Sequence, residues 1–284
     1  MTSPLVWKTP EEVRAWAKAQ SGKRLALVPT MGFLHDGHLS LMREGARRAD
    51  LVTASIFVNP TQFGPKEDLS RYPRDPEGDL KRCASAGVVG VYMPEPSTVY
   101  PSGYQTYVNV EEVSQGLDGD KRPGHFRGVA TVVAKLLALF RPDVALFGEK
   151  DWQQLQVIKR LNADLELGVQ IIGMPTIREN DGLAMSSRNS YLSAEERKRA
   201  LGLSKGLFTA QKLAAGGEKD VSKLLAVIRA ELTAVNARED YVEICDASSL
   251  KTLTTLVKGQ PARGLIAAFM GTTRLIDNMA IELG

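Results

Sequence analysis

The chain has 284 residues, of which 43% are hydrophobic and 24% charged, and its net charge is +3. This length is enough for one large or two ordinary globular domains, and the charge is too small to indicate a nucleic-acid partner. The two cysteines, Cys83 and Cys245, form no metal or redox motif, which favours a reducing compartment. The sequence shows neither a signal peptide nor an apolar run of about 20 residues. We therefore expect a cytoplasmic protein without membrane contact.

Strands and helices alternate over the first 175 residues. Thr9 and Pro10 are typical of a helix N-cap and first turn, and they predict an amphipathic helix that ends near residue 20. The apolar and β-branched runs predict strands over residues 25–28, 51–58, 88–93, 105–110, 143–147 and 169–174. Further helices are predicted after Asp36 and over residues 79–86, 129–140 and 151–162. This alternation predicts an α/β fold with a doubly wound, Rossmann-like parallel sheet.

The segments between these elements are predicted to be loops. Residues 65–76 are charged and contain prolines, and residues 94–104 have no periodic apolar pattern. Residues 116–128 carry four glycines and little apolar content, which predicts a long irregular segment. Such segments are either functional lids or disordered, and the sequence leaves both alternatives open.

The pattern changes after residue 190. Ser193 and Glu196 predict a capping box, followed by helices over residues 194–214 and 219–237. Strands are then predicted over residues 241–246 and 265–269, with a further one at 274–277. We therefore expect a first domain over residues 1–175 and a second, smaller α+β domain over residues 176–284.

Two histidines, His35 and His38, lie where the first buried strand passes into the helix after Asp36. A helix N-terminus presents unpaired N–H groups and the positive end of the helix dipole, which favours bound phosphate. Histidines at this point can donate hydrogen bonds to a phosphoryl oxygen. The alternative is structural: His38 packs in the first turn, and Asp36 or His35 caps the helix.

Three further polar segments follow predicted strands or the 175–182 segment: Asn59–Gln62, Gly148–Asp151 and 185–189. Each one alone is typical of a turn or a solvated surface. Together they supply the groups that hold a nucleoside triphosphate, because cations such as Lys150 and Arg188 can neutralise a departing pyrophosphate. The chain contains neither a P-loop nor a G-x-G-x-x-G sequence.

The segment His35-Asp36-Gly37-His38 resembles the HxGH motif of the nucleotidyltransferase superfamily, and Met185–Arg188 resembles its second motif. More narrowly, five segments in this order resemble the pantothenate synthetase family: PTMGFLHDGHLSL, FVNPTQF, RPGHF, FGEKDWQQL and DGLAMSSRNSYL. The resemblance covers essentially the whole chain. It implies an ATP-dependent ligase that condenses pantoate with β-alanine through a pantoyl-adenylate, and that releases AMP and pyrophosphate.

The resemblance also implies roles for particular residues. His38 would be catalytic, assisted by His35, Lys150 and Arg188. Pantoate would contact Gln62, Gln154, Asn59 and Met31. ATP would contact residues of several motifs, namely Met31, Gly32, His35, His38, Gly148, Lys150, Asp151, Ile177, Met185, Ser186, Ser187 and Arg188. The family implies Mg²⁺ with ATP, a homodimer, and a smaller domain that closes over the ATP site; we predict no particular protein ligand for the metal.

The chemistry agrees with this hypothesis. A carboxylate is a poor acyl donor, and joining it to AMP supplies a good leaving group, so the protein needs positive charge at the phosphates rather than a nucleophilic side chain. Apolar neighbours, Met31, Phe57, Val129 and Val132, would accept the two methyl groups of pantoate.

The same residues are compatible with two other functions. A metal hydrolase would use His35, His38, His125 and a carboxylate, and a nucleotide sensor would bind ATP without catalysis. We expect no zinc. Because His125 lies in the glycine-rich segment, we expect it to be structural or part of a lid rather than catalytic.

Overall fold

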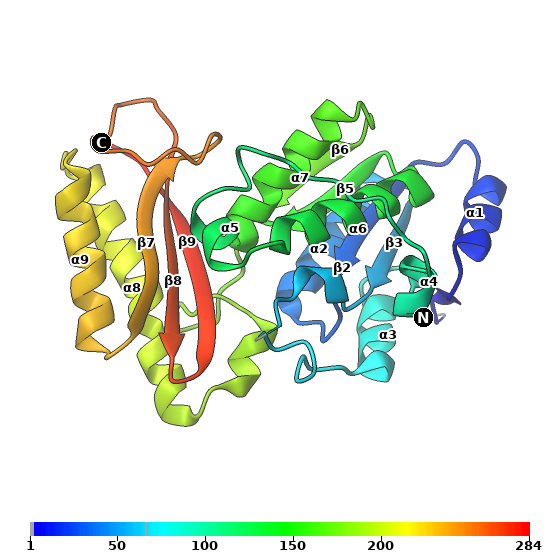
Figure 1. The fold of residues 1–284 in the computed structure, drawn as a ribbon, viewed down its shortest axis with the longest axis horizontal. Coiled ribbons are helices and arrows are strands. Elements are labelled where there is room, and N and C mark those ends of the chain that lie inside the picture. The colour runs from blue at the N-terminus through cyan, green and yellow to red at the C-terminus, as the bar shows by residue number, and fades with distance from the viewer. Residues whose placement is uncertain (1–2, 66) are drawn as a thin grey trace. The chain divides into compact units, whose positions relative to one another are not determined.

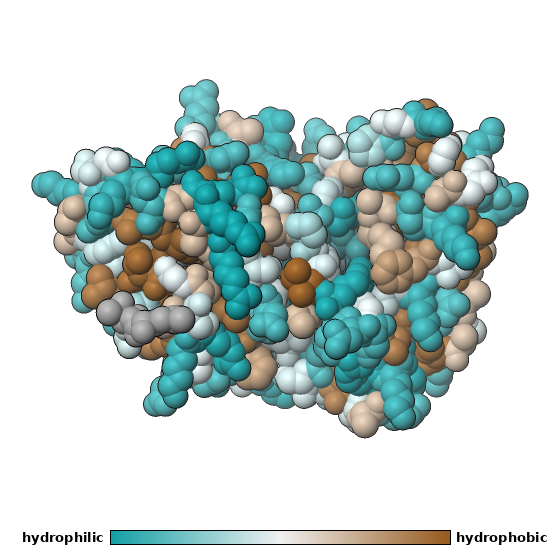
Figure 2. Space-filling view, turned by 180° about the vertical axis from the view of Figure 1, so that it is seen from behind, coloured by the Kyte–Doolittle hydropathy of each residue, from teal (hydrophilic) through white to brown (hydrophobic). Residues whose placement is uncertain are grey.

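The computed structural model describes residues 3–65 and 67–284, which form two compact units. The first unit comprises the chain up to Glu149 together with Gln154–Pro175, and the second comprises Lys150–Gln153 and Thr176–Gly284. The predicted boundary assigned Lys150–Gln153 to the first domain, whereas here these four residues group with the second unit. In the described part of the chain, no helix is both long and apolar enough to cross a bilayer. Hydrophilic side chains predominate on the face in Figure 2, and hydrophobic ones form small groups.

The first unit is built on a six-stranded parallel sheet, which confirms the predicted doubly wound α/β fold (Figure 1). The strand order is β1-β4-β3-β2-β5-β6. The strands are β1 (Leu5–Trp7), β2 (Leu25–Thr30), β3 (Leu51–Ile56), β4 (Gly90–Tyr92), β5 (Val144–Gly148) and β6 (Gln170–Met174). Because the order reverses at β2 and β5, the carboxyl ends of these strands flank the position where ligands bind in such sheets.

Helices cover both faces of this sheet. Right-handed crossovers place α2 (Asp36–Arg48) and α3 (Pro76–Ser85) on one face, because β2, β3 and β4 follow each other in one direction. The crossovers in the other direction place α1 (Pro10–Ala19), α6 (His125–Phe140) and α7 (Trp152–Asp164) on the opposite face. Met42 of α2 and Cys83 of α3 are fully buried against the sheet, in one apolar core. Thr9 is the predicted N-cap of α1, and in the structure it also forms a capping box with Glu12.

Several local predictions were wrong. Residues 105–110 form no strand: their side chains are β-favouring, but a strand needs a neighbour, and Val108 N–H instead donates to Thr131 Oγ1 at 3.0 Å. The 116–128 segment contains the short helix α5 (Leu117–Lys121) and the start of α6, and another short helix, α4 (Pro96–Val99), lies in a predicted loop. The short strand β1 was missed. Its three residues are too few to show the alternation of apolar and polar side chains that indicates a strand. The strand forms because it pairs with β4.

The second unit confirms the predicted α+β organisation. Helices α8 (Ala194–Ala215) and α9 (Val221–Ala234) precede an antiparallel sheet of β7 (Arg238–Asp246), β8 (Ala262–Met270) and β9 (Thr273–Ile281). Leu207, Ile228 and Ile266 are fully buried in its core. A Cβ added to Gly202 would lie 2.6 Å from Val235 Cγ2, so this glycine lets α8 approach the end of α9 closely.

The first prediction concerns the close packing of β1 on β4. A Cβ added to Gly90 would lie 2.0 Å from Cη2 of Trp7, a ring that is itself packed against Trp16. We expect Gly90→Ala to lower the free energy of unfolding by about 1–3 kcal/mol through overpacking, measured by urea denaturation. Gly148→Ala is the matched control, because a Cβ at this strand glycine meets nothing within 4 Å. A Trp7→Leu background should reduce the cost of Gly90→Ala; an undiminished cost would contradict the explanation.

Candidate active site

The loop after β2 turns the chain sharply into α2. Gly32 has φ 85° and Phe33 has φ 51°, so two consecutive residues adopt left-handed backbone conformations. For phenylalanine this conformation costs about 1–2 kcal/mol, and the surroundings must hold it in place. Thr30 Oγ1 accepts the N–H of Gly32 at 3.2 Å and donates to the carbonyl of Ser55 at 2.8 Å, which ties the loop to β3.

His35 and His38 form a pair at the first turn of α2. His35 Nδ1 accepts the N–H of Gly37 at 3.2 Å, and His38 Nδ1 accepts the N–H of His35 at 3.2 Å. The ring centroids are 4.1 Å apart. Because each Nδ1 accepts a hydrogen bond, each neutral ring carries its proton on Nε2, which is then a donor directed away from the backbone. The structural alternative is correct in that His35 caps α2, and this capping uses the Nδ1 side of the ring.

A steric constraint explains why residue 37, between the two histidines, is a glycine. A Cβ at Gly37 would lie 2.9 Å from both Cε1 and Nδ1 of His35. Any larger residue would push the imidazole off the helix N-terminus. The HxGH spacing therefore permits the ring of the first histidine to fold back over its own helix.

Asn59 and Gln62 form a second polar group, after β3. Asn59 Nδ2 donates to Gln62 Oε1 and to the carbonyl of Gly128, each at 3.1 Å. Asn59 Oδ1 accepts from Tyr100 Oη at 2.8 Å and from Thr61 Oγ1 at 2.9 Å. With its oxygen facing Asn59, Gln62 presents its amide NH₂ on the other side, where Nε2 lies 3.1 Å from Met31 Sδ. Gln62 is thus oriented as a hydrogen-bond donor.

A half-buried charged network supports the backbone of Gln62. The carbonyl of Gln62 lies 2.9 Å from His125 Nδ1, and His125 Nε2 lies 3.0 Å from Arg122. Burial and the nearby Arg122 charge lower the pKa of His125 to about 4, so this ring is neutral, with Nδ1 as the donor. Arg122 also makes two 2.8 Å hydrogen bonds to the Glu67 carboxylate. Burial alone would raise the pKa of Glu67, but the hydrogen bonds and charge of Arg122 outweigh it, and the pKa is lowered.

His125 is therefore structural, as expected. Both of its ring nitrogens are engaged within the network, which removes it from a metal site with His35 and His38. Among residues 3–65 and 67–284, no group of three or more His, Cys, Asp or Glu side chains is arranged to hold a metal ion. Sequence reasoning missed Arg122, Glu67 and Tyr100; the RPGHF segment was a signal for Arg122, but the partners are distant in sequence.

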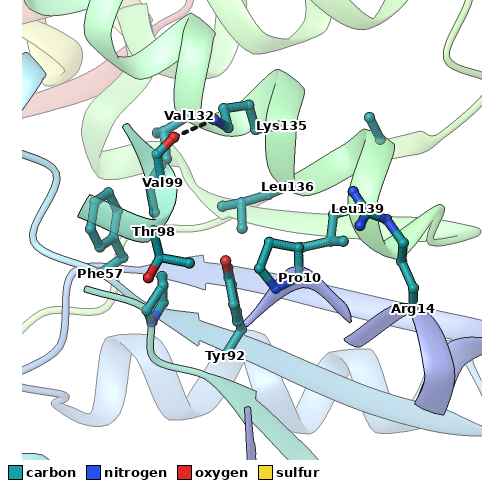
Figure 3. A pocket seen from close by; sticks show the side chains of 12 residues that line it. Pro10, Arg14, Phe57, Tyr92, Thr98, Val99, Val132, Lys135, Leu136 and Leu139 are labelled. Carbon is teal, nitrogen blue, oxygen red and sulfur yellow. Dashed lines mark hydrogen bonds between the residues drawn. The ribbon is translucent and has the colours of Figure 1, made fainter. Parts of the chain in front are cut away.

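A cavity of about 300 Å³ lies beside this region, bordered by α1, α4, α6 and the end of β4 (Figure 3). Two of the predicted apolar neighbours of pantoate, Phe57 and Val132, line it, but Met31 and Val129 do not. The ammonium group of Lys135 turns away from its open space and donates a hydrogen bond to the carbonyl of Val99. The motif histidines and Gln62 are not part of its wall, so the cavity is distinct from the candidate site.

In the second unit, Lys150 and Trp152 are anchored at the small sheet. Asn278 of β9 donates from Nδ2 to the carbonyl of Lys150 at 2.7 Å, and Trp152 Nε1 donates to the carbonyl of Ala247 at 2.8 Å. Lys150 Nζ lies 3.9 Å from Asp151 Oδ1. These contacts explain why the four residues 150–153 group with the second unit.

The Met185–Arg188 segment is also built from local contacts. The N–H of Met185 donates to the carbonyl of Ile177 at 3.0 Å, which brings these two predicted ATP contacts together. Ser186 caps the short 3₁₀ helix η3 (Ser187–Tyr191), accepting the N–H of Arg188 at 3.2 Å. Arg178, which follows Ile177, attaches this segment to β9. It makes hydrogen bonds of 2.7 and 2.9 Å to the buried carboxylate of Asp277.

The predicted residues therefore form two local groups. The first unit brings together the loop of Met31 and Gly32, the histidine pair, and Asn59 with Gln62; Gly148 ends β5 and Gln154 lies in the first turn of α7. The second unit contains Lys150, Asp151, Ile177 and Met185–Arg188.

Comparison with known proteins assigns the family. A model described as Pantoate-beta-alanine ligase matches residues 5–280. The pantothenate synthetase of Myxococcus xanthus is 65% identical over 98% of this chain and 97% of its own length. The chain belongs to the pantoate–β-alanine ligase family. Its enzymatic class is that of an ATP-dependent ligase.

Solved structures of this ligase family share the whole fold. The pantothenate synthetase of Thermus thermophilus has a TM-score of 0.93 and 44% identity, covering 98% of this chain and 99% of that one. The ligase of Francisella tularensis, complexed with beta-gamma ATP and beta-alanine, has a TM-score of 0.82 and 30% identity over 99% of both chains.

The second prediction concerns the contact of α6 with Gln62 in this ligase. A Cβ at Gly128 would lie 2.5 Å from the carbonyl oxygen of Thr61 and 2.7 Å from the amide nitrogen of Gln62. Because these are backbone atoms, we expect Gly128→Ala to displace the segment, lower the free energy of unfolding by about 1–3 kcal/mol, and accelerate amide hydrogen exchange at Gln62. The control is Ala138→Ser at an exposed position of α6, which should change neither measurement. Unchanged exchange at Gln62 in Gly128→Ala would contradict the packing argument.

Proposed function

We propose that the chain joins pantoate to β-alanine in two steps, through an enzyme-bound pantoyl-adenylate. The observation that carries this proposal is the histidine pair at the start of α2, whose two Nδ1 atoms are held by backbone N–H groups. That arrangement aims two neutral donors and a helix N-terminus at one region, which suits the phosphates of ATP. The Francisella tularensis relative, complexed with beta-gamma ATP and beta-alanine, supports the choice of these substrates.

In the first step, a carboxylate oxygen of pantoate attacks the α-phosphorus of ATP. A new carboxyl O–P bond forms, the bond from the α-phosphorus to the bridging oxygen breaks, and pyrophosphate leaves with the bonding electrons. His35 and His38 donate their Nε2–H groups to phosphate oxygens, on which charge increases in the transition state. We propose that Lys150 and Arg188 add positive charge at the departing pyrophosphate when the second unit closes over ATP.

In the second step, the amine of β-alanine attacks the carbonyl carbon of the adenylate. The C–N bond forms, the bond to the AMP oxygen breaks, and the nitrogen loses a proton. AMP is a good leaving group, so the step needs alignment of the reactants more than a nucleophilic side chain. Neither the metal-hydrolase alternative nor the sensor alternative requires Lys150 and Arg188 of the second unit to neutralise a departing pyrophosphate.

Gln62 and Gln154 are proposed to hold pantoate. Its carboxylate must keep its charge available for attack, and a tightly paired cation would stabilise the ground state and reduce this reactivity. The amide NH₂ of Gln62 orients the acid without neutralising it. Asn59 is 1% exposed and its amide is occupied by protein groups, so its contribution acts through the orientation of Gln62.

The remaining ATP contacts are proposed to be those that the motifs imply. Met31 and Gly32 with Gly148 come from the first unit, and Asp151, Ile177, Met185, Ser186 and Ser187 come from the second. Mg²⁺, which the family implies, would be held through the phosphates of ATP, since this ion commonly keeps waters and substrate oxygens as ligands. When bound, it neutralises phosphate charge. The homodimer and the cytoplasmic location stay predictions.

The third prediction tests the order of the chemistry and the role of His38. With ATP and pantoate but no β-alanine, we expect labelled pyrophosphate to enter ATP. His38→Asn retains a side-chain oxygen for the N–H of His35 but lacks the Nε2 donor, so exchange should fall by about 100–1000-fold while stability changes little.

Amine attack on supplied pantoyl-adenylate is the internal control for His38→Asn, and it should be much less affected than exchange. Equal losses in both half-reactions would show that His38 does not serve adenylation specifically. Exchange that requires β-alanine would overturn the two-step order, and ATP binding without any exchange would favour the sensor.

The fourth prediction concerns Gln62. Gln62→Glu keeps the oxygen that accepts from Asn59 but places a carboxylate against the pantoate carboxylate, so pantoate affinity should fall strongly. ATP affinity should change little, with both ligands measured separately by calorimetry. Gln170→Glu, at the exposed amino end of β6, is the control for the added charge. An equal fall in ATP and pantoate affinity would contradict this assignment.

A further inference from the structure

A carboxylate that the proposed reaction does not use lies behind the histidine loop. Asp79 belongs to α3 and is 1% exposed. Its Oδ2 accepts the N–H of Phe33 at 2.8 Å, and its Oδ1 accepts the N–H of Leu34 at 2.7 Å. One carboxylate therefore holds two consecutive N–H groups of the loop that begins α2.

The loop at this point is the strained one. Phe33 has a left-handed backbone, and a Cβ at Gly32 would approach Asp79 Oδ2 to 3.0 Å and Ile56 Cγ2 to 2.9 Å. The two N–H groups would otherwise be free to attract phosphate themselves. Because Asp79 accepts both of them, the loop itself offers these two N–H groups to no ligand, and the following histidines begin α2 from a fixed position.

This arrangement is unfavourable for stability. Burial and the nearby charge of Asp75 raise the pKa of Asp79, although the two backbone hydrogen bonds and the charge of Arg82 act in the opposite direction. Cys83 is the other titratable neighbour, and its own pKa is raised to about 12 by burial and by Asp79. In the described part of the chain, no cation forms a salt bridge with Asp79. A buried charge without a salt bridge is costly, which suggests a functional reason for keeping it.

We propose that Asp79 is a positioning residue for phosphate binding: its carboxylate fixes the loop of Phe33 and Leu34 so that His35 and His38 are aligned on the triphosphate. This inference rests on the proposed function, and it assigns Asp79 no contact with ATP. An amide cannot replace the carboxylate, because Asn has one acceptor oxygen and its NH₂ group would face one of the two N–H groups.

The test compares Asp79→Asn with Asp75→Asn in the full chain. Asp75 caps the same helix, accepting the N–H of Gly78 at 3.0 Å, but it does not touch the loop. Calorimetry with ATP and urea unfolding are measured on both variants. We expect Asp79→Asn to lose about tenfold or more in ATP affinity, as for one charge-assisted hydrogen bond, and Asp75→Asn to keep its ATP affinity. Equal ATP affinity in Asp79→Asn and the wild type, or the same loss in both variants, would overturn the proposal.

A second measurement uses the wild type, so that it does not depend on whether Asp79→Asn folds. NMR titration locates the pKa of the Asp79 carboxyl, and ATP affinity and unfolding free energy are measured as the pH falls through it. Since the folded-state pKa is raised, protonation stabilises the fold, yet it replaces one acceptor by a hydroxyl and releases the loop. As the pH falls, we expect the contribution of Asp79 to ATP affinity to decrease. Over the same pH range, its contribution to the free energy of unfolding should increase. Both changing in the same direction would show a merely structural role.

The ATP measurements also separate this proposal from the proposed function. A wild type that binds ATP but shows no pyrophosphate exchange would contradict the ligase chemistry, and the comparison of ATP affinities would still decide the role of Asp79. A wild type that does not bind ATP would overturn both.

Discussion

The candidate site depends on one constraint: the Nδ1 atom of each histidine of the pair accepts a hydrogen bond from a backbone N–H. That bond determines the tautomer of each neutral ring, with the proton on Nε2. It also requires a glycine between the rings, because a Cβ at Gly37 would collide with His35. In the proposed function, helix capping uses one side of each ring and phosphate binding the other.

Buried and half-buried polar groups behind the candidate site fix the orientation of its side chains and backbone. Asn59 sets the direction of the Gln62 amide, while Arg122 and His125 hold its carbonyl. Asp79 likewise holds the loop before the histidines, by accepting the N–H groups of Phe33 and Leu34. Each of these groups has to be desolvated, which costs free energy that apolar side chains would not. Such a supporting layer keeps donors in position before the substrate arrives, so little reorganisation is needed during the reaction.

The amino-acid sequence by itself determined the parallel sheet, the small α+β unit and the location of the motifs. Apolar runs of strand length between amphipathic helices depend on local periodicity, and they were found within a few residues. The motif segments were recognisable because glycine and proline positions limit what the backbone can do there. The strand expected over residues 105–110 failed for the opposite reason: β-propensity is local, but a strand exists only where another strand pairs with it.

Tertiary structure alone decided what surrounds each motif. Asp79 lies 46 residues from Phe33 and 45 from Leu34, and Arg122 lies 55 residues from Glu67, so no spacing in the sequence connects them. The same holds for residues 150–153, which follow a strand of the first unit but are anchored by Asn278 and Ala247 of the second. Long-range hydrogen bonds between irregular segments leave no periodic signature. They form only after the strands and helices have brought distant segments together.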